Sequence, residues 1–275
     1  MRYADAGTAR IAYDDEGPRA DDAVVFLGGW CNSGRSFFAP LAERLAARHR
    51  VIRLDWRGHG DSGRPAADFG HDELADDAMA VIQATGVRHV VPVTQAHGGW
   101  PALRLRRLLG HRVPRIVLLS WMVLDPPPPF MAVFEMLEDP GRWRQGLDSL
   151  LGGWLAGAPE DVAGWTRRET GSYGFDMWSR AARAVTADYG RYGSPLRAAT
   201  ELDQKPDLLH LYSQPRTAGF LAGQQEFSAA NPWFSARRLN GVTHFPALEI
   251  PDATAAEIDR FPGLSRTAGG SSCRS

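Results

Sequence analysis

Cysteine is scarce in this sequence. Only Cys31 and Cys273 occur among the 275 residues, and neither has histidine or cysteine neighbours at a spacing that would bind a metal ion. The pair gives no disulfide framework, and this cysteine usage suits a reducing compartment. We therefore expect a cytoplasmic protein with no metal site.

Long apolar runs and an excess of charge of one sign are also missing. No stretch approaches the roughly 20 apolar residues that span a bilayer, and residues 1–10 carry no apolar run of signal-peptide length. The 31 basic and 32 acidic residues give a net charge of -1. We expect neither a membrane nor a nucleic acid as partner, because phosphate neutralisation requires a broad basic surface.

The sequence does contain enough apolar material for one large core, since 44% of its residues are apolar and 23% are charged. Short apolar runs alternate with helical patterns, which is typical of parallel βαβ units in one sheet. The runs predicted as strands are 23–27, 51–54, 89–93, 115–119, 207–212 and 234–239. The stretches predicted as helices between and after them are 36–48, 72–85, 100–109 and 254–261.

A proline-rich run at residues 125–129 interrupts this alternation. Residues 130–200 then have helical patterns, no clear strand and four tryptophans, of which three are expected in the core. We predict a helical cap at 125–200, inserted into an α/β core formed by residues 1–124 and 201–264. The tail at 265–275 is predicted to be disordered.

An apolar strand is predicted to turn sharply into a helix at residues 94–100, Thr-Gln-Ala-His-Gly-Gly-Trp. This pattern is typical of the nucleophile elbow of α/β-hydrolases, where a serine is presented at the turn and glycines let helix and strand pack closely. Here the presented residue is Ala96, which has no hydroxyl to attack a substrate. We predict an α/β-hydrolase fold, a mostly parallel central sheet flanked by helices with an inserted helical cap, that is not a serine hydrolase.

Two further loops follow predicted strands where such a fold builds its site. Residues 28–32 lie where hydrolases carry their oxyanion loop, so the backbone N–H groups of Trp30 and His97 would converge on one anionic oxygen. His244 follows the last predicted strand, in the chain position of a triad base, and is our candidate general base.

The group that would orient His244 stays open at this point. The loop after 207–212 carries no acid, whereas Ser120 follows the preceding strand and Asp125 lies a few residues later. Asp125 is in a position to cap the turn into the proline run. A serine stabilises an imidazolium much less than a carboxylate does.

Six short blocks carry a family resemblance. They are Gly29-Trp30-Cys31, Asp55-Trp56-Arg57-Gly58-His59-Gly60, His97-Gly98-Gly99-Trp100, Ser213-Gln214-Pro215, Pro232-Trp233-Phe234-Ser235 and Thr243-His244-Phe245-Pro246. From about residue 24 to 261 the chain resembles the cofactor-independent 3-hydroxy-4-oxoquinoline and quinaldine 2,4-dioxygenases. The resemblance implies that dioxygen cleaves the ring of a 3-hydroxy-4(1H)-quinolone or similar N-heteroaromatic without metal or flavin, with release of carbon monoxide.

The resemblance also implies roles for individual residues. His244 would remove the 3-hydroxyl proton, and the amides of Trp30 and His97 would form the pocket for oxygen or peroxide. Ser120 takes the position of the acid that orients the family's histidine. The residues that would bind the substrate are Asn32, Gln95, Ala96, Phe130, Leu150 and Trp154.

Four positions depart from the family pattern. The family's elbow serine falls on Ala96, its acid on Ser120, and two of its histidines on Asn32 and Gln95. A non-oxidative lyase or cyclase, or a protein that binds an aromatic metabolite, is therefore the alternative. A plain esterase would require another hydroxyl to take over at the elbow. We expect a small aromatic substrate and dioxygen as partners, no cofactor, and a monomer or weak homodimer.

Overall fold

The computed structural model describes residues 1–261, and the predicted tail at 265–275 lies outside that range. In the described part of the chain, eight strands form one sheet in the order β1-β2-β4-β3-β5-β6-β7-β8. The strands are β1 (Arg2–Asp5), β2 (Arg10–Glu16), β3 (Asp22–Leu27), β4 (Arg50–Leu54), β5 (His89–Gln95), β6 (Arg115–Leu119), β7 (Asp207–Tyr212) and β8 (Phe234–Arg238).

The sheet is parallel except at one edge. β1 pairs antiparallel with β2, and β2 antiparallel with β4, whereas the other neighbours are parallel. Parallel strands end at the same edge of a sheet, so the loops that follow β3, β5, β6 and β8 are brought together there. The central strands are buried on both faces, which explains their nearly continuous apolar runs.

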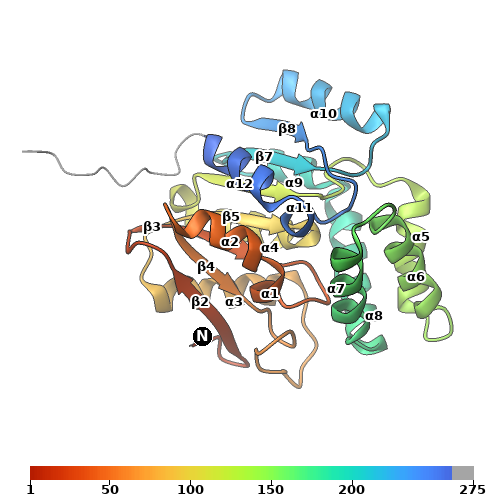
Figure 1. The fold of residues 1–275 in the computed structure, drawn as a ribbon, viewed down its shortest axis with the longest axis horizontal. Coiled ribbons are helices and arrows are strands. Elements are labelled where there is room, and N and C mark those ends of the chain that lie inside the picture. The colour runs from red at the N-terminus through yellow and green to blue at the C-terminus, as the bar shows by residue number, and fades with distance from the viewer. Residues whose placement is uncertain (262–275) are drawn as a thin grey trace, which may run out of the picture.

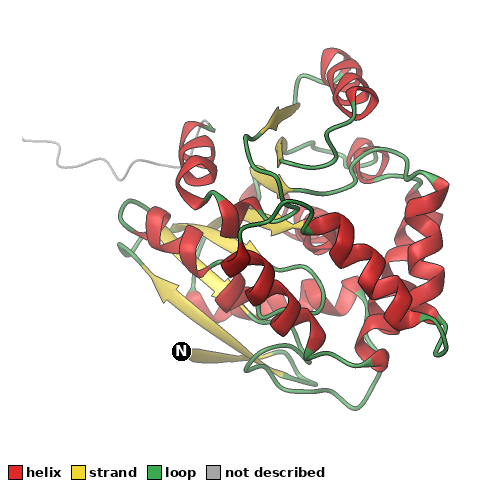
Figure 2. Cartoon of the chain, turned by 45° about the vertical axis from the view of Figure 1, so that its right-hand side comes forward, coloured by secondary structure: helices red, strands yellow, loops and turns green. Residues whose placement is uncertain are grey.

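Helices cover both faces of the sheet (Figure 1; Figure 2). One core contains Leu74 of α3 and Leu103 of α4, and a second contains Leu41 of α2 and Ile258 of α12. The helices outside the β6–β7 connection are α1 (Gly34–Phe37), α2 (Ala39–Ala46), α3 (His71–Thr85), η1 (Ala96–Gly98), α4 (Gly99–Leu109), η2 (Gly110–Arg112), α10 (Ala218–Ala230), α11 (Pro246–Glu249) and α12 (Pro251–Arg260).

The chain leaves the sheet after β6 and forms five helices before it returns at β7. They are α5 (Pro128–Glu138), α6 (Trp143–Trp154), α7 (Glu160–Gly171), α8 (Phe175–Tyr192) and α9 (Pro195–Thr200), which we call the helical insertion. The helices α5 to α8 stand together at one side of the sheet (Figure 1). The proline run ends inside α5, because a proline needs no hydrogen-bond acceptor in the first turn of a helix.

The structure contains all six predicted strands and all four predicted helices of the core. The predicted helix 36–48 is divided into α1 and α2, and Pro40 stands at the start of α2. Strands β1 and β2 and helix α10 were not predicted. No helix among residues 1–261 combines the length and the apolar character needed to cross a membrane.

Candidate active site

The turn between β5 and the following helix has the strained geometry of a nucleophile elbow. Ala96 has φ 45°, a left-handed conformation that residues with a side chain rarely adopt. A Cβ on Gly98 would lie 2.4 Å from the carbonyl oxygen of Gly28, and one on Gly99 would lie 2.1 Å from the ring of Trp121. The two glycines therefore let η1 and α4 pack directly against the end of β3 and against Trp121.

The loop after β3 is held in place by hydrogen bonds to its backbone. Cys31, with φ 59°, donates its N–H to Nε2 of His59 at 3.0 Å, and Ser33 donates its N–H to Glu169 of α7 at 2.7 Å. The N–H of Trp30 has no partner among residues 1–261. It is therefore free to donate to a ligand, as an oxyanion loop requires.

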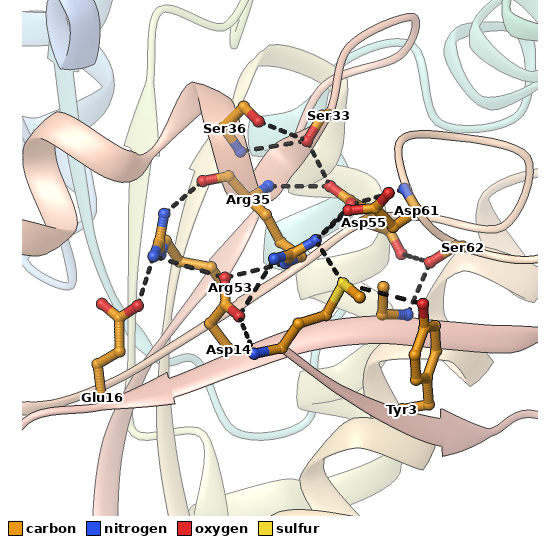
Figure 3. A network of polar contacts seen from close by, with 12 residues as sticks. Tyr3, Asp14, Glu16, Ser33, Arg35, Ser36, Arg53, Asp55, Asp61 and Ser62 are labelled. Carbon is orange, nitrogen blue, oxygen red and sulfur yellow. Dashed lines mark hydrogen bonds and ion pairs between the residues drawn. The ribbon is translucent and has the colours of Figure 1, made fainter.

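A buried carboxylate anchors the end of this loop (Figure 3). Asp55 accepts hydrogen bonds from Ser33 Oγ at 2.8 Å, from the N–H of Arg35 at 3.0 Å and from the N–H of Asp61 at 3.1 Å. The side chain of Arg35 bridges Asp55 to Asp14 and Asp61. Asp55 and Asp61 thus stabilise loops, and neither residue lines the cavity described below.

The indole of Trp30 is oriented from the helical insertion. Its Nε1–H donates to Nε2 of His71 at 2.9 Å, and Nδ1 of His71 lies 2.6 Å from a carboxylate oxygen of Asp188 on α8. Because an indole N–H can only donate, Nε2 of His71 is the acceptor and Nδ1 carries the proton. Phe69 stacks on the indole ring of Trp30, with ring centroids 5.6 Å apart.

His244 lies on a loop that is fixed through its backbone. Glu249 accepts 2.7 Å hydrogen bonds from the N–H groups of Val242 and Thr243, and Gln95 Nε2 donates to the carbonyl oxygen of His244 at 3.0 Å. The imidazole stacks on Trp154, with ring centroids 5.0 Å apart and an angle of 11°.

The imidazole of His244 itself makes no hydrogen bond or ion pair within residues 1–261, so both ring nitrogens are free to meet a ligand. Burial lowers its pKa from 6.5 to about 3, and the nearby His210 contributes to this shift. Burial disfavours the charged form, so His244 is neutral and can accept a proton at neutral pH.

Ser120, the candidate orienting group, is buried at the end of β6. Its φ is 46°, and its hydroxyl has no hydrogen-bond partner in the described part of the chain, His244 included. Asp125 is exposed and forms an ion pair with Arg197, so it does not reach His244 and no capping hydrogen bond from it is seen. The structure therefore gives His244 no acid partner among residues 1–261.

A narrow cavity lies between these loops and the helical insertion. It offers about 50 Å³ to the centres of water-sized molecules, and apolar atoms make up most of its wall. It is lined by Gly29, Trp30, Asn32, Gln95, Ala96, His97, Phe134, Leu137, Leu150, Trp154, Thr170, Trp178, Ala181, Val185, His244 and Phe245. Flat rings and aliphatic side chains of this kind form a slot that suits a planar aromatic ligand.

The cavity wall contains no acidic side chain, and residues 1–261 hold no group of three or more histidine, cysteine, aspartate or glutamate side chains that could bind a metal ion.

Comparisons with known proteins agree with this fold and identify the family of the chain. The family profile described as alpha/beta hydrolase fold matches residues 22–167. The chain is 39% identical to 2-heptyl-3-hydroxy-4(1H)-quinolone dioxygenase of Mycobacteroides abscessus, covering 92% of this chain and 95% of that protein. It is 35% identical to 1H-3-hydroxy-4-oxoquinoline 2,4-dioxygenase of Pseudomonas putida, covering 95% and 99%. The chain belongs to the 3-hydroxy-4-quinolone 2,4-dioxygenases.

Solved structures agree with this family membership. An AqdC variant in complex with its substrate, described in terms of recognition and ring cleavage of the Pseudomonas quinolone signal, superposes with a TM-score of 0.89 at 36% identity. The match covers 94% of this chain and 97% of that one. An enol-lactonase from Burkholderia xenovorans LB400 is only 19% identical at a TM-score of 0.75, and shows the α/β-hydrolase fold alone. The chain is thus a dioxygenase on a hydrolase fold.

Most of the residues predicted for this dioxygenase site come together. Of the predicted residues, only Ser120 and Phe130 are absent from the cavity wall, and Phe130 packs behind it against His97 and Phe134. Sequence reasoning missed Phe134, Leu137 and Val185. Trp178 is buried in the core, as expected for three of the four tryptophans, and it also lines the cavity. These residues come from α5 and α8, whose amphipathic patterns indicate a buried face but not what that face covers.

Proposed function

We propose that this chain is a cofactor-independent dioxygenase that cleaves the ring of a 2-alkyl-3-hydroxy-4(1H)-quinolone, with His244 as the base. One observation carries the proposal: a neutral histidine with both ring nitrogens free lies in an apolar aromatic slot in which alanine occupies the nucleophile position. This arrangement suits proton transfer from a planar hydroxylated ring and does not suit acyl transfer.

The proposed reaction balances without a further reactant. His244 accepts the 3-hydroxyl proton, and the resulting anion donates electrons to dioxygen. One oxygen atom bonds to C2 and the other to C4, while the C2–C3 and C3–C4 bonds break. C3 leaves with its oxygen as carbon monoxide, and the proton returns to give an N-acylanthranilic acid.

The anionic species of this reaction need hydrogen-bond donors at fixed positions. The free N–H of Trp30 is one candidate. His97 lies in the first turn of the continuous segment η1–α4, where backbone N–H groups lack an intrahelical acceptor, and its N–H is the other. We assign the oxygen or peroxide pocket to these two amides.

The substrate class follows from the wall of the cavity and from the relatives. Leu137, Leu150 and Val185 surround the slot with aliphatic groups, and a relative of 39% identity acts on a 2-heptyl quinolone. Asn32, Gln95, Ala96, Leu150 and Trp154 are the proposed substrate contacts, and Phe130 supports them from behind. We also propose that the helical insertion acts as the cap predicted at 125–200. Cytoplasmic location and a monomeric or weakly dimeric state stay predictions.

The experiment is oxygen uptake by metal-depleted protein with 3-hydroxy-2-alkyl-4(1H)-quinolones, with carbon monoxide measured in the headspace. We expect equal amounts of oxygen consumed and carbon monoxide released. His244→Ala should lower kcat by about 10²–10⁴-fold because it removes the general base. His111→Ala is the matched control, since His111 is exposed and does not line the cavity.

The same experiment separates the alternatives. Turnover under argon would indicate a non-oxidative lyase or cyclase. Binding of the quinolone without turnover in air would indicate a protein that only sequesters the ligand. Either result contradicts the proposed dioxygenase reaction.

A further inference from the structure

The cavity holds a second histidine whose side chain has a defined hydrogen-bond partner. Trp121, which follows β6, donates its indole Nε1–H to Nδ1 of His97 at 3.3 Å. The ring of His97 lines the cavity and lies edge-on to Phe134, with ring centroids 5.6 Å apart. Its other nitrogen, Nε2, has no partner within residues 1–261.

This hydrogen bond determines the position of the proton on His97. An indole N–H can only donate, so Nδ1 of His97 must be the acceptor and carry no proton. The hydroxyl of Tyr189, which also interacts with the indole of Trp121, donates its proton to the carbonyl oxygen of Met122 at 2.7 Å. Neither neighbour offers an acceptor for a proton on Nδ1.

The charge state of His97 is also defined. Burial holds the pKa of His97 well below its ordinary value, because it disfavours the charged form. A neutral imidazole carries one ring proton, and since Nδ1 is an acceptor, that proton resides on Nε2. Nε2–H is then a donor that points at no protein atom.

Trp121 is itself held firmly. Its backbone N–H donates to Nε2 of His210 at 3.2 Å, and Nδ1 of His210 pairs with Gln224 Oε1 at 2.5 Å. The indole is 2% exposed and lies against Gly99, where any side chain would displace it. The donor to His97 is therefore fixed from both the backbone and the side chain.

We propose that the imidazole of His97 is a fixed hydrogen-bond donor to an oxygen of the deprotonated substrate, and that Trp121 is the positioning residue that sets its tautomer. The inference rests on the proposed function, because it assigns a side-chain role in stabilising the quinolone anion. It divides the two cavity histidines: His244 presents an acceptor for a proton, and His97 presents a proton for an anion.

The first test uses the protein without ligand. Nitrogen-15 NMR of histidine-labelled protein distinguishes the two neutral tautomers from the imidazolium, and the spectrum of His97→Gln assigns the signals of His97. We expect the Nε2–H tautomer at neutral pH. A proton on Nδ1, or an imidazolium, overturns the proposal whether or not any variant folds.

The second test compares Trp121→Phe with Trp100→Phe. Trp100 packs against Trp121, with ring centroids 5.0 Å apart. Its buried indole nitrogen has no hydrogen-bond partner among residues 1–261. Trp100→Phe therefore removes the same indole atoms as Trp121→Phe but no hydrogen bond to His97. The measured quantity is the pKa of the 3-hydroxyl of bound 3-hydroxy-2-methyl-4(1H)-quinolone, followed by absorbance under argon. Trp121→Phe should weaken binding of the anion by roughly tenfold, which raises that pKa by about one unit.

The outcomes are distinguishable. Equal shifts in the two phenylalanine variants, or none in either, overturn the role of Trp121. His97→Gln, which keeps an N–H donor, should retain more anion affinity than His97→Leu, and the reverse order overturns the role of His97. If the wild-type protein binds no quinolone, the proposed function fails, and the NMR tautomer still decides whether His97 is a donor.

Discussion

The basicity of His244 sets the demands on the substrate. With no acid beside it among residues 1–261 and a pKa of about 3, its neutral form dominates across physiological pH but accepts a proton weakly. Proton transfer to such a base is easier from an acidic hydroxyl. In the proposed reaction, the N–H groups of Trp30 and His97 and the Nε2–H of His97 would compensate by stabilising the anion that remains.

The pH dependence of kcat/KM follows from the sign of this shift. The pKa of His244 is lowered from 6.5 to about 3, so the base stays unprotonated as pH falls from about 8 to about 5. We expect no acidic limb near pH 6.5 in kcat/KM. A limb at that pH that disappears in His244→Ala would contradict the assigned pKa.

Ser120 offers a way to restore the missing charge. Its backbone has φ 46°, a conformation that aspartate and asparagine tolerate better than most residues. If position 120 faces His244, Ser120→Asp should raise the pKa of His244 and increase kcat by roughly tenfold, because a carboxylate stabilises the imidazolium. Asparagine has nearly the same size as aspartate but no charge, so Ser120→Asn serves as the control. Equal kcat in the two variants would show that this position does not orient the base.

At the scale of elements, the segment η1–α4 joins the elbow to the core. Its first residues touch the end of β3 through Gly98 and the ring of Trp121 through Gly99. The positions of the Ala96 turn, the His97 ring and Trp121 thus depend on these two close contacts.

Substitution of Gly99 should disturb the Ala96 turn, the His97 ring and Trp121 together. Gly99→Ala would place a Cβ 2.1 Å from the buried Trp121 ring, and we expect a loss of about 1–3 kcal/mol in the free energy of unfolding from overpacking. Gly152→Ala is the control, because Gly152 is exposed in α6 and its Cβ would meet nothing within 4 Å. That variant should be neutral or more stable by up to about 1 kcal/mol. Urea denaturation measures both, and equal stability would refute the close contact.

Elements also show where sequence reasoning works. Strands β3, β6 and β7 are buried on both faces, so their apolar runs predict them directly. β1 is four residues long and largely exposed, and α10 lies beside the edge strand β8 with few buried positions, so neither has a strong pattern. His244 and Ala96 could be predicted because they follow strands within short motifs. The place of Trp178 on the cavity wall could not be predicted, because only the packing of α8 determines which of its sides meets the cavity.

At the scale of the whole molecule, the helical insertion and the sheet meet at the loop after β3. Glu169 of α7 accepts the N–H of Ser33, and Asp188 of α8 reaches Trp30 through His71. Residues more than 100 positions apart in the chain therefore determine the shape of the proposed anion pocket.

Removing one of these connections should affect stability and turnover together. Glu169→Ala deletes a charge-assisted hydrogen bond to a backbone N–H, which should lower the free energy of unfolding by about 1.5–3 kcal/mol and reduce kcat more than it changes KM. Glu160→Ala, at an exposed position of the same helix, should change stability by no more than about 0.5 kcal/mol. A kcat equal to that of the control would show that the loop keeps its shape alone.

The loop after β3 is attached to the helical insertion at two points, through Glu169 of α7 and through Asp188 of α8. Helices α7 and α8 both hold the loop after β3, and residues of the same two helices line the cavity. In the proposed reaction, support of the anion and exclusion of bulk water would therefore depend on the same contacts. A variant that loses one of these contacts should admit water and bind the quinolone anion less tightly at the same time.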